Sequence, residues 1–461
     1  MELFDPTIVA PATAAGGAIA VIRVSGPDAI ACTDRIFRGR NPLSDAPGYS
    51  MHYGAVVEPD GAMLDEVVVS VFRAPHSYTG ENAVEIACHG SSYIVSRMLA
   101  LLLENGAKMA APGEFTQRAF AHGKMDLSQA EAVADLIAAQ TAAAHRIALK
   151  QLKGGFSDEL AGMRAELLHL SSLMELELDF SEEEVEFADR TALQQLVEKV
   201  LEHIQQLIDS FRLGNAIKNG VPVAIVGNTN SGKSTLLNAL VGEDRAIVSD
   251  IAGTTRDTIE ETVNLDGVLF RFIDTAGLRQ SEDTIERIGI GRAYQKLEAA
   301  QLVLAMLDLT APLLDLLASV QDIARRVSDD QQLIFLLNKA DAVPETTVAD
   351  VRKALPDGDS HVISAKTGQG LTELRQAIAA RWRDLDTSAE TTLVTNTRHL
   401  EALQNAATEL RRVQDGLHTS IPTDLVAQDL RESLYHLASI VGEVSNSEIL
   451  ANIFSRFCIG K

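Results

Sequence analysis

The residues best placed to do chemistry lie in one glycine-rich run, Gly227-Asn228-Thr229-Asn230-Ser231-Gly232-Lys233-Ser234. This run fits the pattern G-x-x-x-x-G-K-[ST], in which the backbone wraps a phosphate so that successive N–H groups point at the anion. Lys233 is expected to reach the β- and γ-phosphates, and the Ser234 hydroxyl to bind Mg²⁺. The apolar strand expected at 223–226 precedes the run and an apolar helix follows it, which is the order that a nucleotide-binding loop requires.

Two further segments follow in the order expected of a phosphate-sensing site. The run Gly253-Thr254-Thr255-Arg256-Asp257 offers a threonine hydroxyl that can complete the Mg²⁺ shell and sense the γ-phosphate. The run Asp274-Thr275-Ala276-Gly277 ends an expected strand. Its aspartate can hold Mg²⁺ through water, and its glycine N–H can meet the γ-phosphate.

The base is expected to be guanine. In Asn338-Lys339-Ala340-Asp341, the aspartate can accept hydrogen bonds from both N1–H and the 2-amino group of guanine. Adenine lacks both donors, and a site built to pair with them rejects the analogue without them. The run Ser364-Ala365-Lys366 supplies a backbone lid over the base. Five such elements in order predict GTP rather than ATP. The expected nucleotide contacts are Asn230, Ser231, Gly232, Lys233, Ser234, Thr235, Ser249, Thr254, Thr255, Asp274, Thr275, Ala276, Gly277, Asn338, Lys339, Asp341, Ser364, Ala365 and Lys366.

One position departs from the best-known GTPases. Leu278 stands where a Ras-like protein places the glutamine that orients the attacking water. A leucine side chain cannot hydrogen-bond to water. Either the domain is slow, or another group positions the nucleophile.

Composition limits the class of protein. The 461 residues suggest roughly three domains. Forty basic against 64 acidic residues give a net charge of −24, so any contact with nucleic acid must come from a local patch or through a partner. The three cysteines show no metal-ligand spacing and indicate a reducing compartment. No run of 18 apolar residues free of charge and no secretory signal occurs, so a cytoplasmic protein without a membrane contact is expected.

The elements that must position these residues change in type along the chain. Residues 1–120 are rich in β-branched residues and turns, which predicts an α+β unit. Ser128 and Glu131 fit a capping box at the start of a helical region, and the alanine-rich stretch 130–144 is expected to form one helix. From Pro222 on, buried strands alternate with helices, which predicts a parallel sheet covered on both faces. The tail from 397 is helical again, so the α/β unit is expected to be inserted in one helical domain; two separate helical domains would give the same pattern.

Taken together, these elements resemble the MnmE (TrmE) family of tRNA wobble-uridine GTPases. Besides the nucleotide motifs, the resemblance rests on the N-terminal Thr7-Ile8-Val9-Ala10 and the terminal Phe457-Cys458-Ile459-Gly460-Lys461, and it covers essentially the whole chain. It implies a multidomain fold with an N-terminal α+β folate-binding domain, an all-α helical domain and an inserted α/β Ras-like P-loop G domain. The implied boundaries are 1–120 for the folate-binding and dimerisation domain, 121–215 and 385–461 for the two parts of the helical domain, and 216–384 for the G domain.

The resemblance also implies the activity and the partners. Members hydrolyse GTP to drive addition of an aminomethyl or carboxymethylaminomethyl group at C5 of uridine 34 in certain tRNAs. The carbon comes from 5-formyl- or 5,10-methylene-tetrahydrofolate. The partner is MnmG, which uses FAD and NADH and forms a heterotetramer with the homodimer, so tRNA is reached through the complex.

Several site residues are carried over by motif. Glu286 replaces the missing glutamine, and together with Lys233 and Thr255 it forms the implied catalytic set. Members are activated when two G domains meet across K⁺, which would be held here by the oxygens of Asn230, Ser249, Ile251 and Thr254, while Mg²⁺ would be held by Ser234 and Thr255. The implied folate ligands are Arg23, Glu85, Lys124 and Lys461, and Cys458 is implied in the modification chemistry.

Two other functions fit parts of the pattern. A ribosome-assembly or switch GTPase would bind RNA with no folate chemistry, but the acidic composition and the lack of a basic RNA-binding module argue against it. A metabolic GTP-using kinase is disfavoured because the switch loop and N-K-x-D are features of regulatory GTPases.

Overall fold

The computed structural model describes residues 6–14, 16–179, 190–243, 261–273, 300–328, 331–356, 358–382, 392–419, 421–444, 447–455, 457 and 460. The chain forms two compact units, which are described separately. The first comprises Met1–Ala134, Gln151–Ala188 and Ser420–Lys461, and the second comprises Asp135–Lys150 and Asp189–Thr419.

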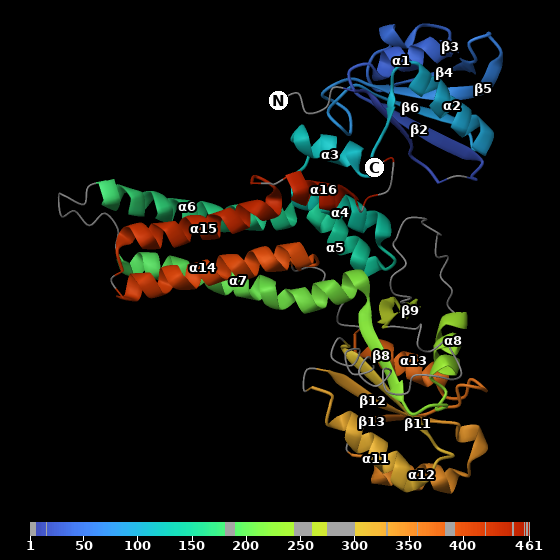
Figure 1. The fold of residues 1–461 in the computed structure, drawn as a ribbon, viewed down its shortest axis with the longest axis vertical. Coiled ribbons are helices and arrows are strands. Elements are labelled where there is room, and N and C mark those ends of the chain that lie inside the picture. Colours follow the sequence, from blue (N-terminus) through green and yellow to red (C-terminus); the bar gives the residue numbers. More distant parts are fainter. Residues whose placement is uncertain are drawn as a thin grey trace. The chain divides into compact units, whose positions relative to one another are not determined.

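A seven-stranded sheet organises the N-terminal part of the first unit (Figure 1). Its spatial order is β3-β4-β5-β6-β2-β1-β7, and every pair is antiparallel except β1 with β7. The strands are β1 Ile8–Pro11, β2 Ile19–Ser25, β3 Phe37–Gly39, β4 Ser50–Val57, β5 Met63–Phe72, β6 Ala83–His89 and β7 Lys108–Met109. The helices beside them are α1 Ala29–Ile36, the 3₁₀ turn η1 Leu43–Asp45 and α2 Ser92–Glu104.

The two faces of this sheet differ because side chains alternate along each strand. Ile22, Val24 and Ile86 point into a core shared with Met98 of α2 and are fully buried. Arg23, between Ile22 and Val24, therefore points to the opposite face. The alternation along the strand thus decides which residues remain available for a ligand.

Helices complete the first unit. They are α3 Glu114–Ala121, α6 Gly155–Asp179, α15 Thr423–Val441 and α16 Ser447–Ser455. Helices α6 and α15 lie side by side although more than 240 residues separate them (Figure 1). The division between the units falls within α4 Leu127–Ala138 and α5 Ala142–Leu152.

A six-stranded sheet organises the second unit, in the order β13-β12-β11-β8-β10-β9. The strands are β8 Val221–Gly227, β9 Glu261–Leu265, β10 Val268–Phe272, β11 Leu302–Asp308, β12 Gln332–Asn338 and β13 Asp359–Val362. The sequence predicted a parallel sheet, and this is wrong at one edge, where β9 runs antiparallel to β10. The two strands form a hairpin through Asp266 and Gly267, both with positive φ, and so short a connection allows only antiparallel pairing.

Helices cover both faces of this second sheet, as predicted (Figure 1). Helices α8 Lys233–Glu243 and α13 Leu371–Ala380 pack on one face, and α11 Leu313–Ala324 and α12 Glu345–Ala354 on the other. The 3₁₀ turn η3 spans Ala340–Ala342. Outside the sheet, α7 Arg190–Asn219 packs along α14 Thr397–Thr419, so a helix before the sheet pairs with one after it.

The capping box predicted at Ser128 and Glu131 is wrong, because α4 begins earlier, at Leu127. The capping box is formed by Asp126 and Gln129: the N–H of Gln129 donates to Asp126 Oδ1 at 2.9 Å, and the N–H of Asp126 donates to Gln129 Oε1 at 2.9 Å. Ser128 lies inside the helix, where its hydroxyl bonds Asp126 and Ser157. Both spacings are three residues, so the pattern alone could not choose between them.

The alanine-rich stretch is also not one helix as expected. It breaks between α4 and α5, because Thr141 starts a new helix by accepting the N–H of Ala144 at its hydroxyl, at 3.1 Å. Among the described residues, no helix combines the length and apolarity needed to cross a membrane.

Candidate functional site

The glycine-rich run forms a tight loop between β8 and α8. Gly227 and Gly232 have φ of +150° and +102°, and Asn230 has φ of +63°. A Cβ on Gly227 would collide with the carbonyl oxygen of Met306, and one on Gly232 would collide with the side-chain amide of Asn338. Only glycine allows this conformation and this close approach, so the loop is shaped as a cradle of backbone groups at a helix N-terminus.

Polar groups in this loop have unused bonding capacity. The Ser231 side chain is fully buried, and its hydroxyl has no hydrogen-bond partner among the described residues. Lys233 turns back onto the loop, where its Nζ donates to the carbonyl oxygens of Gly227 at 2.9 Å and Asn228 at 2.8 Å. Burial lowers the pKa of the Lys233 ammonium. A partly buried cation whose partners among the described residues are neutral carbonyls is a good partner for an anion.

Asn338, at the end of β12, joins the loop to a second segment. Its Nδ2 donates to the carbonyl oxygen of Ser231 at 2.7 Å, and its Oδ1 accepts the N–H of Ala365 at 2.9 Å. The side chain is 3% exposed, so both bonds are shielded from water. The structure therefore brings together three of the predicted motifs: the glycine-rich loop, N-K-x-D and the 364–366 lid.

Lys339 is held by a residue that lies outside the sequence motifs. Its Nζ donates to Asp308 Oδ2 at 2.6 Å, at the end of the neighbouring strand β11. Burial raises the pKa of Asp308, but hydrogen bonds from Lys339 and Thr310 outweigh it, so this pKa lies below its usual value. Asp308 could have been noticed because it ends a fully apolar strand at the same edge as Asn338.

The other predicted base contacts lie around this cluster. Asp341 is exposed in the turn η3, and Lys366 is exposed beside the buried Ser364 and Ala365. The Ser364 hydroxyl accepts the N–H of Thr367 at 3.2 Å and shapes the turn. Ser234 and Thr235 lie in the first turn of α8.

Several predicted residues lie outside the described part of the chain. These are Ser249, Ile251, Thr254, Thr255, Asp274, Thr275, Ala276, Gly277, Leu278, Glu286, Cys458 and Lys461. Their roles remain predictions.

The first unit contains a second cluster, around Arg23 of β2 and Glu85 of β6. These residues face each other in the strand register, and the Nε and Nη2 of Arg23 donate to Glu85 Oε1 at 2.9 and 2.8 Å. The guanidinium lies 5.4 Å from the ring centroid of Tyr78 and 5.7 Å from that of Phe115. Its Nη1 donates to the carbonyl oxygen of Gly460 at 3.2 Å. Glu85 Oε2 has no hydrogen bond within the described chain, so one carboxylate oxygen remains for a ligand.

Lys124 is not joined to this pair by any contact of the described residues. Its Nζ donates to the carbonyl oxygen of Pro75 at 3.0 Å. The structure thus brings Arg23 and Glu85 together from the predicted set and leaves Lys124 on the neighbouring loop.

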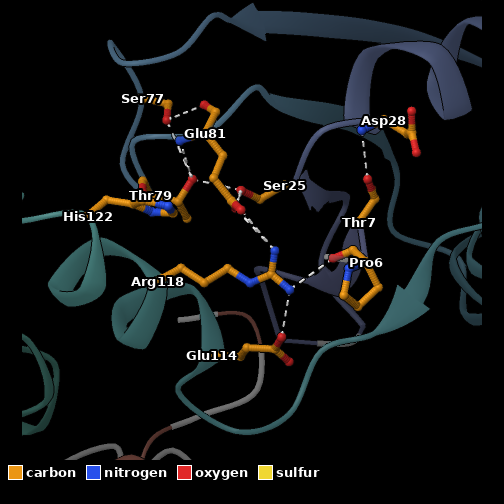
Figure 2. A network of polar contacts seen from close by, with 10 residues as sticks. All are labelled: Pro6, Thr7, Ser25, Asp28, Ser77, Thr79, Glu81, Glu114, Arg118 and His122. Atoms are coloured by element: carbon orange, nitrogen blue, oxygen red, sulfur yellow. Dashed lines mark hydrogen bonds and ion pairs between the residues drawn. The ribbon is translucent and has the colours of Figure 1, made fainter. Parts of the chain in front are cut away.

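Beside the pair lies a buried ionic network that the sequence analysis did not find (Figure 2). Arg118 of α3 is fully buried; its Nη1 donates to both oxygens of Glu81, at 3.1 and 3.2 Å. Its Nη2 donates to Glu114 Oε1 at 2.8 Å and to the carbonyl oxygen of Pro6 at 3.0 Å. Ser25, two residues from Arg23 on β2, donates to Glu81 Oε2 at 2.8 Å. No motif marks an isolated arginine, so only the fold could identify it.

Comparison with known proteins finds relatives that cover nearly the whole chain. The family model described as the MnmE helical domain matches residues 127–458, and that of the GTP-binding protein TrmE N-terminus matches residues 7–124. The chain is 52% identical to a tRNA modification GTPase MnmE from Bacteroides fragilis over 99% of both chains. It is 52% identical to the protein of that name from Parabacteroides distasonis, over 99% of this chain and all of the relative. It is 48% identical to that from Flavobacterium johnsoniae, over 99% of both chains.

Proposed function

This chain belongs to the MnmE family of tRNA modification GTPases, and from that membership we propose that it hydrolyses GTP to drive modification of the wobble uridine of tRNA. In detail, we propose addition of an aminomethyl or carboxymethylaminomethyl group at C5 of uridine 34, with a tetrahydrofolate derivative as carbon donor and MnmG as partner. We also propose that the chain acts in the cytoplasm as a homodimer.

The observation that carries the GTPase proposal is the position of Asn338. This one buried side chain bonds both the glycine-rich loop and the 364–366 lid. Because Asp341 follows it by three residues, the same strand end that fixes the phosphate loop also presents a carboxylate to the base. Selection for guanine and binding of the triphosphate would thus depend on one rigid junction.

The glycine-rich loop supports the proposal for Mg²⁺. The Gly227 and Gly232 cradle, and a Ser231 hydroxyl that has no hydrogen-bond partner among the described residues, suit an oxyanion and its Mg²⁺ ion, with Ser234 and Thr255 as the proposed Mg²⁺ ligands. Mg²⁺ would neutralise charge on the phosphates. For K⁺ we propose Asn230, which has a left-handed backbone conformation in the loop, with Ser249, Ile251 and Thr254. Glu286 is the proposed group that orients water, and Lys233 and Thr255 would stabilise the developing charge.

For folate, we propose Arg23, Glu85, Lys124 and Lys461 as the ligands, with the Arg23–Glu85 pair as the part that the described residues support. A pterin presents an N–H and amino edge, which a carboxylate can accept. Glu85 Oε2 is open for this, whereas Oε1 would have to be shared with Arg23. The carbonyl oxygen of Gly460 accepts a hydrogen bond from Arg23. Cys458, two residues earlier in the sequence, is the proposed modification residue.

The domain boundaries follow the same proposal: 1–120 for folate binding and dimerisation, 121–215 with 385–461 as the helical domain, and 216–384 as the G domain. The pairing of α7 with α14 and of α6 with α15 supports an insertion, because each pair joins helices from both sides of the G domain.

Titration calorimetry with the full-length protein tests the nucleotide proposal directly. We expect binding of GDP and of a non-hydrolysable GTP analogue, and no comparable binding of the adenine nucleotides. Equal affinity for both bases would contradict it.

Nucleoside analysis of tRNA from cells expressing Ser234→Ala or Glu286→Ala tests whether the tRNA modification depends on GTP hydrolysis. We expect loss of the wobble modification together with hydrolysis, with Thr408→Ala, an exposed position on α14, as a folded control outside the proposed site.

A further inference from the structure

We propose that Arg118 is a positioning residue for the Arg23–Glu85 site: its buried ionic network fixes the two aromatic side chains that hold the Arg23 guanidinium. This inference rests on the proposed folate function and extends it, because neither Arg118 nor Glu81 is among the proposed ligands.

The aromatic residues come from two separate segments. Tyr78 lies on the loop between β5 and β6, three residues before Glu81, and Phe115 lies on α3, three residues before Arg118. Each ring is within 6 Å of the Arg23 guanidinium carbon, at 5.4 and 5.7 Å. The orientation of Arg23 therefore depends on how this loop and this helix are held together.

The Arg118–Glu81 pair is the ionic connection between these two segments (Figure 2). Two further contacts join them: the Tyr78 and Thr116 hydroxyls lie 2.9 Å apart, and Nδ1 of His122, at the end of α3, lies 2.8 Å from the carbonyl oxygen of Thr79. Charge-assisted bonds from a fully buried guanidinium are stronger than bonds between neutral groups, so the Arg118–Glu81 pair is the strongest of these connections. Ser25 binds the same carboxylate and joins it to the strand that carries Arg23.

Among the described residues, Glu81 and Glu114 pair with Arg118, and they connect it to different segments. Glu81 is on the loop, so its pairing connects loop to helix, whereas Glu114 is four residues before Arg118 on the same helix. Loss of either removes one of the two carboxylates that the described residues place against the buried cation, and both losses cost stability. Of the two, only the loss of Glu81 breaks the ionic connection to the loop that carries Tyr78. If the network only stabilised the fold, substitution of Glu81 and substitution of Glu114 would affect ligand binding equally.

The experiment measures binding of 5-formyltetrahydrofolate by calorimetry to full-length wild type, Glu81→Gln, Glu114→Gln and Arg118→Lys. Arg97→Lys is the matched control, because Arg97 also pairs with two glutamates, Glu58 and Glu104, in the same unit. We expect Glu81→Gln and Arg118→Lys to weaken binding by about tenfold or more, and Glu114→Gln and Arg97→Lys by less than about threefold. Guanine nucleotide affinity, measured on the same samples, should not change in any of them.

Hydrogen–deuterium exchange without ligand provides a second readout. Peptides covering 77–82 should exchange faster in Glu81→Gln than in Glu114→Gln. The inference is overturned if the two glutamate variants weaken folate binding equally, or if Glu81→Gln binds within threefold of wild type. A wild-type protein that binds no folate overturns the folate proposal instead, and a loop that exchanges alike in both variants overturns the positioning role independently.

Discussion

The side-chain Nδ2 of Asn338 lies 2.7 Å from the carbonyl oxygen of Ser231, a residue 107 positions earlier in the chain. Ser231 belongs to the phosphate loop and Asn338 to the end of β12, so this bond connects the two halves of the nucleotide site. Because Asn338 is also bonded to Ala365, the conformation of the phosphate loop is coupled to that of the base lid.

Asn338→Ala should therefore reduce both stability and nucleotide affinity. The change removes two buried hydrogen bonds and leaves the N–H of Ala365 and the carbonyl of Ser231 without their partner, at a cost of about 2–4 kcal/mol. We expect GDP affinity, measured by calorimetry, to fall at least tenfold. The exposed Asn219→Ala is the control and should change stability by less than about 0.5 kcal/mol. Unaltered GDP binding by Asn338→Ala would contradict the proposed coupling.

Asp308→Asn should weaken nucleotide binding more mildly, because it releases Lys339 without removing it. The pair is partly exposed, which limits its value to about 1 kcal/mol, or roughly fivefold in affinity. The pKa of Asp308 is lowered in the fold, so the contribution is fully present above the ordinary pKa of 3.8 and disappears only as pH falls through the lower, folded value. The difference between wild type and variant should consequently stay constant from pH 5 to 8. A difference that varies across this range would show that another group is involved.

Cys88 should resist alkylation in the native protein. Burial raises the pKa of its thiol to about 11, with Asp65 adding to the effect, against an ordinary value of 9.0. At pH 8 the thiolate fraction is then about a hundredfold lower than that of an unshifted cysteine. Peptide mass spectrometry after iodoacetamide treatment should show a rate that keeps rising between pH 9 and 11. The same peptide in unfolded protein should level off above pH 9, and a native rate that levels off there too would refute the shift.

Asp126→Ala should loosen the start of α4. Loss of this N-cap removes the bond to the Gln129 N–H and costs about 1–2 kcal/mol. Hydrogen exchange at 127–131 should accelerate about tenfold, while peptides of α2 stay unchanged. Gln129→Ala removes the return bond and a 3.2 Å bond from Gln129 Nε2 to the carbonyl oxygen of Leu152, but it keeps the Asp126 cap, so exchange at 127–131 should accelerate less. The reverse order of the two variants would show that Asp126 is not the cap.

Much of the nucleotide site could be predicted because its motifs are local. A phosphate loop needs glycine where a Cβ would collide, as at Gly232, and such requirements are visible in a short run of residues. The strand ends that carry the other motifs also follow from short apolar runs, and the family was recognised from the same residues and is confirmed by the family models.

What the sequence could not provide depends on contacts distant in the chain. Asp308 acquires its role only because β11 and β12 are neighbours in parallel register, which places its carboxylate beside Lys339. Arg118 acquires its role because three segments converge on one buried guanidinium. The predicted capping box was wrong for a different reason. Asp126 with Gln129 and Ser128 with Glu131 both have the spacing of a capping box, and the structure forms the reciprocal bonds at the earlier pair.

Only Gly220 separates the 30-residue helix α7 from β8, the strand whose far end carries the phosphate loop. A Cβ at Gly220 would press against Leu269 and Arg271, so the joint is short and closely packed. At 1.5 Å per residue, α7 is a rod of about 45 Å, and a tilt of 10° at the joint would swing its other end by about 8 Å. This geometry makes the helix a mechanical lever arm, able to enlarge a small strand rotation into a displacement comparable to the width of another helix.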